Sequence, residues 1–336
     1  NGDAGGSVLL AADPADKQGL EVLVPSRLIT DVCGHGSLSF GSILGLPDGQ
    51  SASRSALSGV LGGVTVDGSW VLSSADLARL IDSIGGLTVD VDTGVVQRTA
   101  GGGGRLIVAA GPNQHLSGAQ AVAYATYERT REGAAAQLER LHKVIDAFVL
   151  ALPKSTTGIE ALVRPLGKGA QSSIGVSRLA DMLFNLAAYD QNETGVFPTD
   201  LPIVSLDAGG AFPSYRPDTT SDGVPLLVRT RLANSLPENA NAQHASVLLL
   251  NGVGTPGLVG SACPRLTAAG FTYAGSGNTA KFSRARSQVD IFRNADAEQG
   301  YALADALGLP RSDVRRNTLN QNVATFVVIL GSDYRP

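Results

Sequence analysis

Short apolar stretches near the start of the chain predict two strands that pair as a hairpin. Residues 8–12 and 21–25 are rich in Val and Leu, and the segment between them is polar. We expect the second strand to stop at Pro25, because proline cannot donate a ladder hydrogen bond. Two further apolar, β-branched stretches, 87–91 and 105–109, predict strands on either side of a glycine-rich loop.

Apolar residues at helical spacing predict several helices. Residues 74–84 follow a Ser cap and end at paired glycines, and residues 51–59 and 176–188 show weaker helical patterns. A long helical region spans 117–152 and is interrupted near Gly133. Its second half carries an apolar stripe that should pack on a sheet, formed by Leu138, Leu141, Ile145, Val149 and Leu152.

The last part of the chain is more regular. From residue 246 onward, the pattern predicts the order β-α-β-β-α-β, in which two helices cover one face of a small sheet. A polar segment, 237–243, reads as a linker. We therefore expect an α/β protein with an α-β-α layered domain at 1–236 and a small α+β domain at 244–336.

Length and composition support this division. A chain of 336 residues has room for two domains, and 43% hydrophobic with 17% charged residues excludes disorder. The net charge is −7 for residues 1–243 and +3 for residues 244–336. An acidic chain with 5% aromatic residues argues against nucleic acid as a partner.

The start of the chain suggests that something precedes it. No apolar run reaches the roughly 18 residues of a membrane span, and no basic-then-apolar leader is present. The sequence nevertheless opens almost directly on a predicted strand. We expect a fragment cut just upstream of a folded domain, with any anchor removed.

The two cysteines leave two alternatives open. Cys33 and Cys263 lie far apart in sequence, and our preferred interpretation is a pair of buried thiols that act as small hydrophobic residues. The alternative is a disulfide between the two domains.

Three glycines form a G-x-G-x-x-G motif at positions 252, 254 and 257, between a predicted strand and a predicted helix. No acidic residue follows about 20 residues later to bind a ribose, and Pro256 removes an N–H that a pyrophosphate would need. We therefore predict a tight turn, with Thr255 as the N-cap and Pro256 as the first residue of the helix.

Other common catalytic patterns are missing from the sequence. The histidines at 35, 115, 142 and 244 never occur at metal-ligand spacing, and neither HExxH nor CxxC is present. No G-x-S-x-G elbow places a serine nucleophile. The sequence thus predicts no metal site and disfavours a hydrolase.

Arginines around the long helical region are the best candidates for ligand binding. Arg129, Arg131 and Arg140 lie there, and Arg27 follows the second predicted strand. Converging arginines can hold a phosphate through bidentate hydrogen bonds. A solvated helix face explains the same residues equally well.

Taken together, the segments resemble the LytR-CpsA-Psr (LCP) family of bacterial cell-envelope proteins. The likeness rests on EVLVPSRLITDV followed by GHGSLSFGSILG, on LSGVLGGVTVDGSWVLSSADLARLIDSIGGLTVDVD, and on HLSGAQAVAYATYERTREGAAAQLERLHKVIDAFVLAL. Residues 245–334 resemble the LytR C-terminal domain through VLLLNGVGTPGLVGSACPRLTAAGF and VATFVVILGSDY.

This resemblance implies a membrane-anchored, extracytoplasmic protein that transfers glycopolymers from a polyprenyl-pyrophosphate carrier to peptidoglycan. It also implies arginines that grip the pyrophosphate, aspartates that help to hold Mg²⁺, and an apolar cavity for the lipid. Most polar positions depart from the family pattern. Where the family has arginine or aspartate, this chain has Ser26, Arg27, Thr126, Glu128, Ala134 and Gln137, and only Arg140 keeps its type.

The departures predict a non-catalytic or weakly catalytic envelope protein that binds polyprenyl-linked glycan, peptidoglycan or a protein partner. The alternative is an active LCP-type phosphotransferase that uses relocated arginines. We expect no cofactor, with Mg²⁺ only if the protein is active, and membrane contact only through an anchor missing from this chain. No residue is assigned a catalytic role. The candidate phosphate ligands are Arg140, Arg27, Arg129 and Arg131, and the candidate lipid-cavity residues are Leu138, Leu141 and Ile145.

Overall fold

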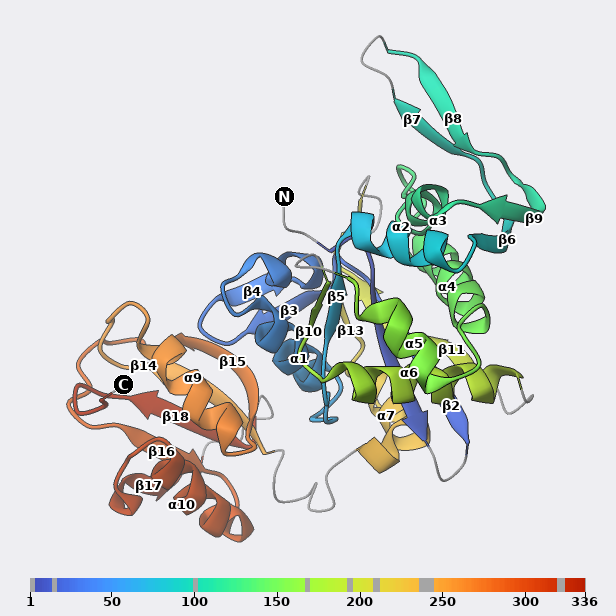
Figure 1. Cartoon of the computed structure of the whole chain (residues 1–336). Coiled ribbons are helices and arrows are strands. Elements are labelled where there is room, and N and C mark those ends of the chain that lie inside the picture. The colour runs from blue at the N-terminus through green and yellow to red at the C-terminus, as the bar shows by residue number, and fades with distance from the viewer. Residues whose placement is uncertain are drawn as a thin grey trace. The chain divides into compact units, whose positions relative to one another are not determined.

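The chain forms two compact units, each built from two separate segments. The first unit holds Asn1–Leu28 and Asp67–Asp218, and the second holds Ile29–Val66 and Thr219–Pro336. Both combine helices with sheets, so the predicted α/β class is confirmed (Figure 1). The computed structural model describes residues 4–13, 17–98, 102–166, 170–191, 196–207, 212–235, 245–318 and 324–335.

The first unit is centred on a three-stranded sheet. Strands β1 (Ser7–Asp13) and β2 (Gln18–Val24) pair antiparallel, which confirms the predicted hairpin. Strand β11 (Val196–Asp200) adds to the other side of β2 in parallel. Every residue of β2 except Gln18 is buried, as expected for the central strand of a sheet that is covered on both faces.

Helices α4 (Ala134–Leu150) and α6 (Val176–Gln191) pack against β2. The predicted long helical region is indeed interrupted before Ala134, and its first part is α3 (Gly118–Ala125). Ser117 begins α3 with a capping box, in which its hydroxyl accepts from Gln120 N while the Gln120 side chain accepts from Ser117 N. Helices and sheet share one core, which contains Leu23, Leu80, Val89, Leu116, Leu138, Val144 and Leu183.

Shorter elements complete this unit. Strand β7 (Val95–Arg98), which the sequence did not reveal, pairs with β8 (Gly104–Val108) in a hairpin that extends away from the helices (Figure 1). The remaining elements are β5 (Trp70–Leu72), α2 (Ser74–Ser83), β6 (Leu87–Val91), β9 (Gly111–Leu116), α5 (Thr156–Val163), β10 (Ala170–Ser172), β12 (Ile203–Ser205) and β13 (Tyr215–Pro217).

The second unit contains a five-stranded sheet with the order β15-β14-β18-β16-β17. Strand β14 is parallel to both neighbours, whereas β16 is antiparallel to β18 and parallel to β17. The predicted β-α-β-β-α-β order is confirmed, with β17 as an additional short edge strand. The elements are β14 (Ser246–Asn251), α9 (Leu258–Ala268), β15 (Thr272–Asn278), β16 (Gln288–Ile291), η3 (Asn294–Asp296), α10 (Ala297–Ala306), η4 (Arg311–Asp313), β17 (Val314–Arg316) and β18 (Phe326–Leu330).

The two helices of this sheet touch each other, so they lie on one face of it, as predicted. Their apolar sides form a core with the inward positions of the strands, among them Val247, Leu249, Leu266, Leu303, Phe326 and Val328. The earlier segment of the same unit contributes β3 (Ile29–Val32), β4 (Gly36–Ser39), η1 (Phe40–Gly45) and α1 (Gly49–Val60), and the later one begins with α7 (Val224–Arg231) and η2 (Ala233–Ser235).

A disulfide joins Cys33 to Cys263, which corrects our preference for two free thiols. The Cα atoms lie 5.8 Å apart, within the usual range for a disulfide. Spacing alone could not reveal this pairing, because the cysteines are 230 residues apart in sequence and meet only when the turn after β3 reaches α9.

The two units are not consecutive in the chain, whereas the sequence predicts two consecutive domains separated by a linker at 237–243. Helix α1 and strand β3 pack against β15, so residues 29–66 belong to the unit of the C-terminal sheet although they precede most of the first unit. The predicted linker itself lies outside the described residues, and the boundary there stays a prediction.

Candidate functional site

The arginine cluster of the first unit forms where the chain leaves β2 and where it enters α4. Tyr215 ties these two places together: its N–H donates to the carbonyl of Arg27 at 3.1 Å, and its hydroxyl accepts from Ala134 N at 2.9 Å. Arg27 is thereby held beside the segment 126–133, which connects α3 to α4. This cluster comprises Arg27, Arg129, Arg131 and Arg140 with the carboxylates of Asp92, Glu128 and Glu132.

Arg140 lies on α4 and its side chain is completely buried. Its guanidinium donates to Glu132 at 2.6 and 3.1 Å and to the carbonyl of Tyr127 at 2.8 and 3.2 Å. A longer contact of 3.5 Å reaches Asp92. Protein groups thus occupy the guanidinium donors of this predicted phosphate ligand.

Arg27 is satisfied in a similar way. It forms a bidentate ion pair with Glu128, one branch of which measures 2.8 Å from Nη2 to Oε2. Its guanidinium also lies 4.7 Å from the centre of the Phe212 ring. Glu128 stands where the family resemblance implies an arginine, so the charge at this position is reversed and is matched by Arg27.

The remaining two arginines are exposed. Arg129 and Arg131 lie in the segment 126–133, where Arg131 has a positive φ of 66°. The backbone N–H of Arg129 donates to Glu132 at 3.3 Å, so this arginine sits next to the Arg140 ion pair. The structure therefore brings Arg27, Arg129 and Arg140 into one neighbourhood with three carboxylates among them. Arg131 lies in the same segment, but its side chain makes no hydrogen bond or ion pair with any described residue.

Asp92 follows β6 and receives the hydroxyl of the buried Tyr124. Burial by itself raises the pKa of Asp92, but the Tyr124 hydrogen bond and the charge of Arg140 outweigh it and lower that pKa below its ordinary value. The hydrogen bond from Arg140 likewise lowers the pKa of Glu132. Both carboxylates are therefore charged at neutral pH.

Other positions that depart from the family pattern serve the fold. Gln137 donates to the carbonyl of Ala125 at 2.7 Å and so joins α4 to the end of α3. Thr126 donates to the carbonyl of Val122 at 2.8 Å. The Ser26 hydroxyl is buried and has no hydrogen-bond partner among the described residues.

The carboxylates do not converge on a position for a cation. Within the ranges that the structure describes, no group of three His, Cys, Asp or Glu side chains could hold a metal ion. Glu132 directs both oxygens to Arg140, and Asp92 accepts from Tyr124 and Arg140. Their lone pairs are therefore largely engaged by hydrogen bonds and ion pairs within the cluster.

The candidate lipid-cavity residues lie in the packed core. Leu138 is 3% and Leu141 is 6% exposed, and Ile145 is half-buried beside them. Strands β1 and β2 supply Val8, Leu10 and Leu23 to the same cluster. A lipid tail would have to separate these contacts, and the lipid role of the three residues stays a prediction.

A surface pocket of about 570 Å³ lies beside α4. Its lining includes His142, whose Nδ1 lies 2.9 Å from Oε2 of the buried Glu21. This hydrogen bond raises the pKa of His142. The pair is not visible in the sequence, because Glu21 lies in an apolar strand whose pattern predicts core positions.

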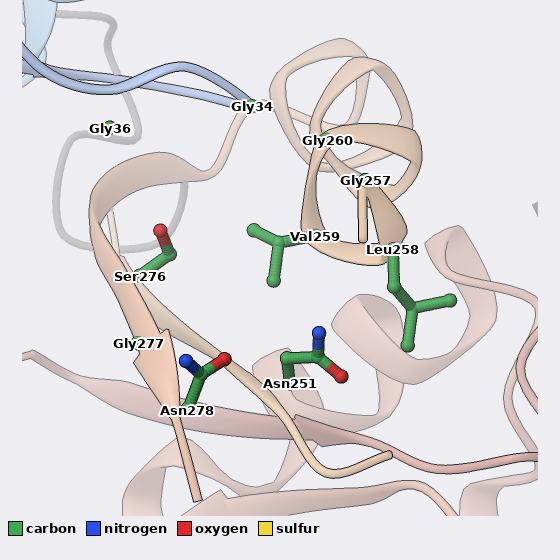
Figure 2. Close-up of a pocket in the computed structure, with 10 residues that line it drawn as sticks. All are labelled: Gly34, Gly36, Asn251, Gly257, Leu258, Val259, Gly260, Ser276, Gly277 and Asn278. Carbon is green, nitrogen blue, oxygen red and sulfur yellow. The ribbon is translucent and has the colours of Figure 1, made fainter. Parts of the chain in front are cut away.

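The second unit has a smaller pocket of about 220 Å³ at the carboxyl ends of β14 and β15. Figure 2 shows the Val259 side chain of α9 pointing toward the strand that carries Ser276 and Asn278. The lining consists of glycines, amides, one hydroxyl and apolar side chains, without a charged group. It offers no side chain suited to a pyrophosphate.

The G-x-G-x-x-G motif is a turn, as predicted, but it is capped differently. Helix α9 begins at Leu258, and its N-cap is Gly257 in the left-handed region at φ 77°, not Thr255. The Asn251 side chain organises the turn: Oδ1 accepts from Val253 N and Gly254 N at 3.1 and 2.9 Å, and Nδ2 donates to Thr255 O at 2.8 Å.

None of the helices described in the structure is both long and apolar enough to cross a membrane.

Two family models match the sequence. Residues 48–211 match the LytR_cpsA_psr family, and residues 244–334 match LytR_C, described as LytR cell envelope-related transcriptional attenuator. No curated protein matches the chain.

Solved structures share the fold at low sequence identity. Bacillus subtilis TagV superposes with a TM-score of 0.56 and 14% identity, over 70% of this chain and 90% of TagV. A structure of TagT bound to LI-WTA gives 0.54 and 16%, over 70% and 85%. A LytR-Csp2A-Psr enzyme from Actinomyces oris gives 0.52 and 18%, over 68% and 85%.

Proposed function

Because the chain belongs to the LytR-CpsA-Psr family, we propose that it acts in the assembly of cell-envelope glycopolymers. In this proposal it binds polyprenyl-linked glycan, peptidoglycan or an envelope protein, and it has little or no transferase activity. A TagT structure with LI-WTA bound supports a glycopolymer as the ligand of this fold.

One observation carries the non-catalytic part: two of the four candidate phosphate ligands already form ion pairs with carboxylates of the chain itself. Glu128 pairs with Arg27, and Glu132 with Arg140. Phosphoryl transfer depends on free positive charge that stabilises the transferring group. Loss of a single such donor typically costs about 2.7–4 kcal/mol of transition-state stabilisation. With both arginines paired, little of that stabilisation is left.

The disulfide supports a location outside the cytoplasm. Disulfides persist in oxidising compartments and are rare in cytosolic proteins, where thiols are kept reduced. The bond between Cys33 and Cys263 therefore favours an extracytoplasmic protein. We further propose that an N-terminal anchor outside this chain holds it at the membrane.

A second function, active glycopolymer transfer, is favoured by the two exposed arginines. Arg129 and Arg131 carry no ion pair to a described carboxylate side chain and lie beside Glu132. Both are long enough to reach toward a phosphate at the surface of the cluster. Activity of this kind would depend on them and not on Arg27.

The test measures pyrophosphate binding by calorimetry and turnover of a polyprenyl-pyrophosphate substrate with Mg²⁺. We expect no turnover by the wild-type chain and weak pyrophosphate binding. Glu128→Gln releases Arg27 and should raise pyrophosphate affinity about tenfold, equivalent to about 1.4 kcal/mol. Glu139→Gln, an exposed carboxylate on α4 outside the cluster, is the matched control.

Turnover by the wild-type chain that disappears in the Arg129→Ala/Arg131→Ala variant would overturn the non-catalytic proposal and establish the second function. Equal pyrophosphate affinity of Glu128→Gln and wild type would show that the ion pair between Arg27 and Glu128 does not prevent Arg27 from binding pyrophosphate.

A further inference from the structure

A short loop of the second unit combines cationic side chains with an exposed aromatic ring. The loop, 281–286, joins β15 to β16 and reads KFSRAR, and all six residues are exposed. Lys281, Arg284 and Arg286 supply three positive charges, and the Phe282 side chain is 55% exposed. The loop lies outside the arginine cluster described above.

Backbone hydrogen bonds hold this loop at several points. Arg284 N donates to the carbonyl of Gly252 at 3.1 Å, and the Arg284 carbonyl accepts from Ser332 N at 3.0 Å. The Ser332 hydroxyl adds a bond to the carbonyl of Ala285 at 3.1 Å. The 281–286 loop is thus anchored to two neighbouring turns, which fixes the directions in which its side chains leave the surface.

The Phe282 ring lies flat on the glycine turn. A Cβ atom built on Gly254 would lie 3.0 Å from Cγ of the ring and 3.2 and 3.3 Å from its two Cδ atoms. These nearly equal distances place Gly254 over one face of the ring, not at its edge. Glycine is required there, and the opposite face of the ring is left to the solvent.

The charges around the ring are largely free to meet a ligand. Among the described residues, no carboxylate forms an ion pair with Lys281 or Arg284. Arg286 pairs with Asp313 at 3.1 Å, but Asp313 is buried while the Arg286 side chain is 63% exposed. The nearby Asp333 accepts from the N–H and hydroxyl of Ser287 at 2.7 and 2.8 Å.

We propose that the 281–286 loop binds an anionic glycopolymer, with a sugar ring stacked on Phe282 and phosphate or carboxylate groups held by Lys281, Arg284 and Arg286. A ring with one free face suits a flat apolar surface such as the C–H face of a pyranose. Guanidinium groups suit planar or tetrahedral anions. A membrane would instead favour an aromatic ring that extends into the lipid on both faces, whereas the Phe282 ring rests with one face on Gly254.

Single-stranded nucleic acid could use the same combination of ring and cations. We favour a glycan because the proposed function places the protein outside the cytoplasm, and this choice rests on that proposed function. The residues involved, 281–286, are not those of the arginine cluster. Nucleic acid and lipid are therefore outcomes of the experiment.

The experiment uses the full chain and measures binding to a purified sugar-bearing phosphodiester wall polymer, to inorganic polyphosphate, to anionic phosphatidylglycerol vesicles and to an oligothymidylate. We expect the wall polymer to bind most tightly.

Phe282→Ala should weaken wall-polymer binding about tenfold and leave polyphosphate binding unchanged. Lys281→Ala/Arg284→Ala should weaken both and reduce the salt dependence. The matched controls are Leu106→Ala and Arg105→Ala, an exposed apolar residue and an exposed cation of the first unit.

Tighter binding to vesicles or to oligothymidylate than to the wall polymer would overturn the proposal, as would loop variants that bind the polymer like wild type. Far-ultraviolet circular dichroism and the thermal midpoint confirm that each variant is folded. The proposed function is judged separately, by pyrophosphate binding and turnover, which the loop variants should not change. If the loop variants bind the polymer like wild type but Glu128→Gln raises pyrophosphate affinity, only the loop proposal is wrong. If the loop variants lose polymer binding but Glu128→Gln has no effect, only the proposed closure of the arginine cluster is wrong.

Discussion

Arg140 heads the set of largest side chains that the described part of the protein buries completely. A buried guanidinium is tolerated only when charges and hydrogen bonds replace the water it has lost. Glu132, Asp92 and the carbonyl of Tyr127 provide this replacement. Arg140 therefore stabilises the junction between α3 and α4, whatever ligand binds nearby.

Arg140→Met tests this structural role. The substitution leaves Glu132 and Asp92 without their counter-charge, and both remain partly in contact with water, so we expect a loss of about 3 kcal/mol in the free energy of unfolding. Urea denaturation measures it. The double variant Arg140→Met/Glu132→Gln should recover part of the loss, because one of the unpaired charges is removed. A loss below about 1 kcal/mol would contradict the role.

A second residue-scale prediction concerns pH. The hydrogen bond to Glu21 raises the pKa of His142 above its ordinary value near 6.5. The folded state therefore holds the proton more tightly than the unfolded chain, and this stabilisation is complete below about pH 6.5 and is lost as the pH rises through the folded pKa. The urea midpoint of the wild type should fall more between pH 6 and 8.5 than that of His142→Gln. Parallel curves for the two proteins would refute the linkage.

At the residue scale, the sequence shows the arginines of the cluster but not the carboxylates with which they pair. Arg27 and Glu128 are 101 positions apart, and Arg140 and Asp92 are 48 apart, so neither contact follows from local spacing. Glu132 and Arg140 are eight positions apart and face each other only because the segment 126–133 turns back before α4. The charge reversal at Glu128 was visible in the sequence, and its pairing with Arg27 was not.

At the element scale, prediction succeeded where a pattern was long. Helix α4 and the strands β1 and β2 show their apolar positions over several residues, and the structure confirms them. Strands as short as β17 contain too few residues to display a period. The start of α9 was misplaced because Thr255 and Pro256 have the right residue types for a helix start, whereas the tertiary structure uses Gly257.

Asn251 gives the prediction at this scale. Its side chain makes three hydrogen bonds to the backbone of the turn between β14 and α9, and the residue is 9% exposed. Asn251→Ala leaves those backbone groups without partners, which should cost about 1–2 kcal/mol of unfolding free energy. Chemical denaturation of the full chain measures the loss. The exposed Asn278 at the end of β15 provides the control, and Asn278→Ala should change stability by less than about 0.5 kcal/mol.

At the scale of the whole molecule, the second unit is assembled from segments that most of the first unit separates in the chain. Composition and charge reveal a change near residue 240, which is why sequential domains were predicted. They carry no information about where residues 29–66 pack. That placement depends on contacts of α1 and β3 with β15 and on the cysteine pair, all of them distant in sequence.

The disulfide should contribute strongly to the stability of the second unit. A cross-link between cysteines 230 positions apart restricts the unfolded chain, and removal of such a bond typically costs about 2–5 kcal/mol. We expect the Cys33→Ser/Cys263→Ser variant to unfold at clearly lower urea concentration than the oxidised wild type. Wild type treated with a reductant should behave like the variant. Unchanged midpoints in both cases would mean that the packing of α1 and β3 against β15 suffices without the bond.

The same bond turns residues 33–263 into a covalent ring, and most of the first unit lies within that ring. A protease that cuts one peptide bond inside the ring opens it but releases nothing, since both products stay joined through sulfur. Such a nicked molecule would migrate as one species on a non-reducing gel and separate into two pieces only after reduction. A protein cut once between its cysteines would thus remain a single molecule.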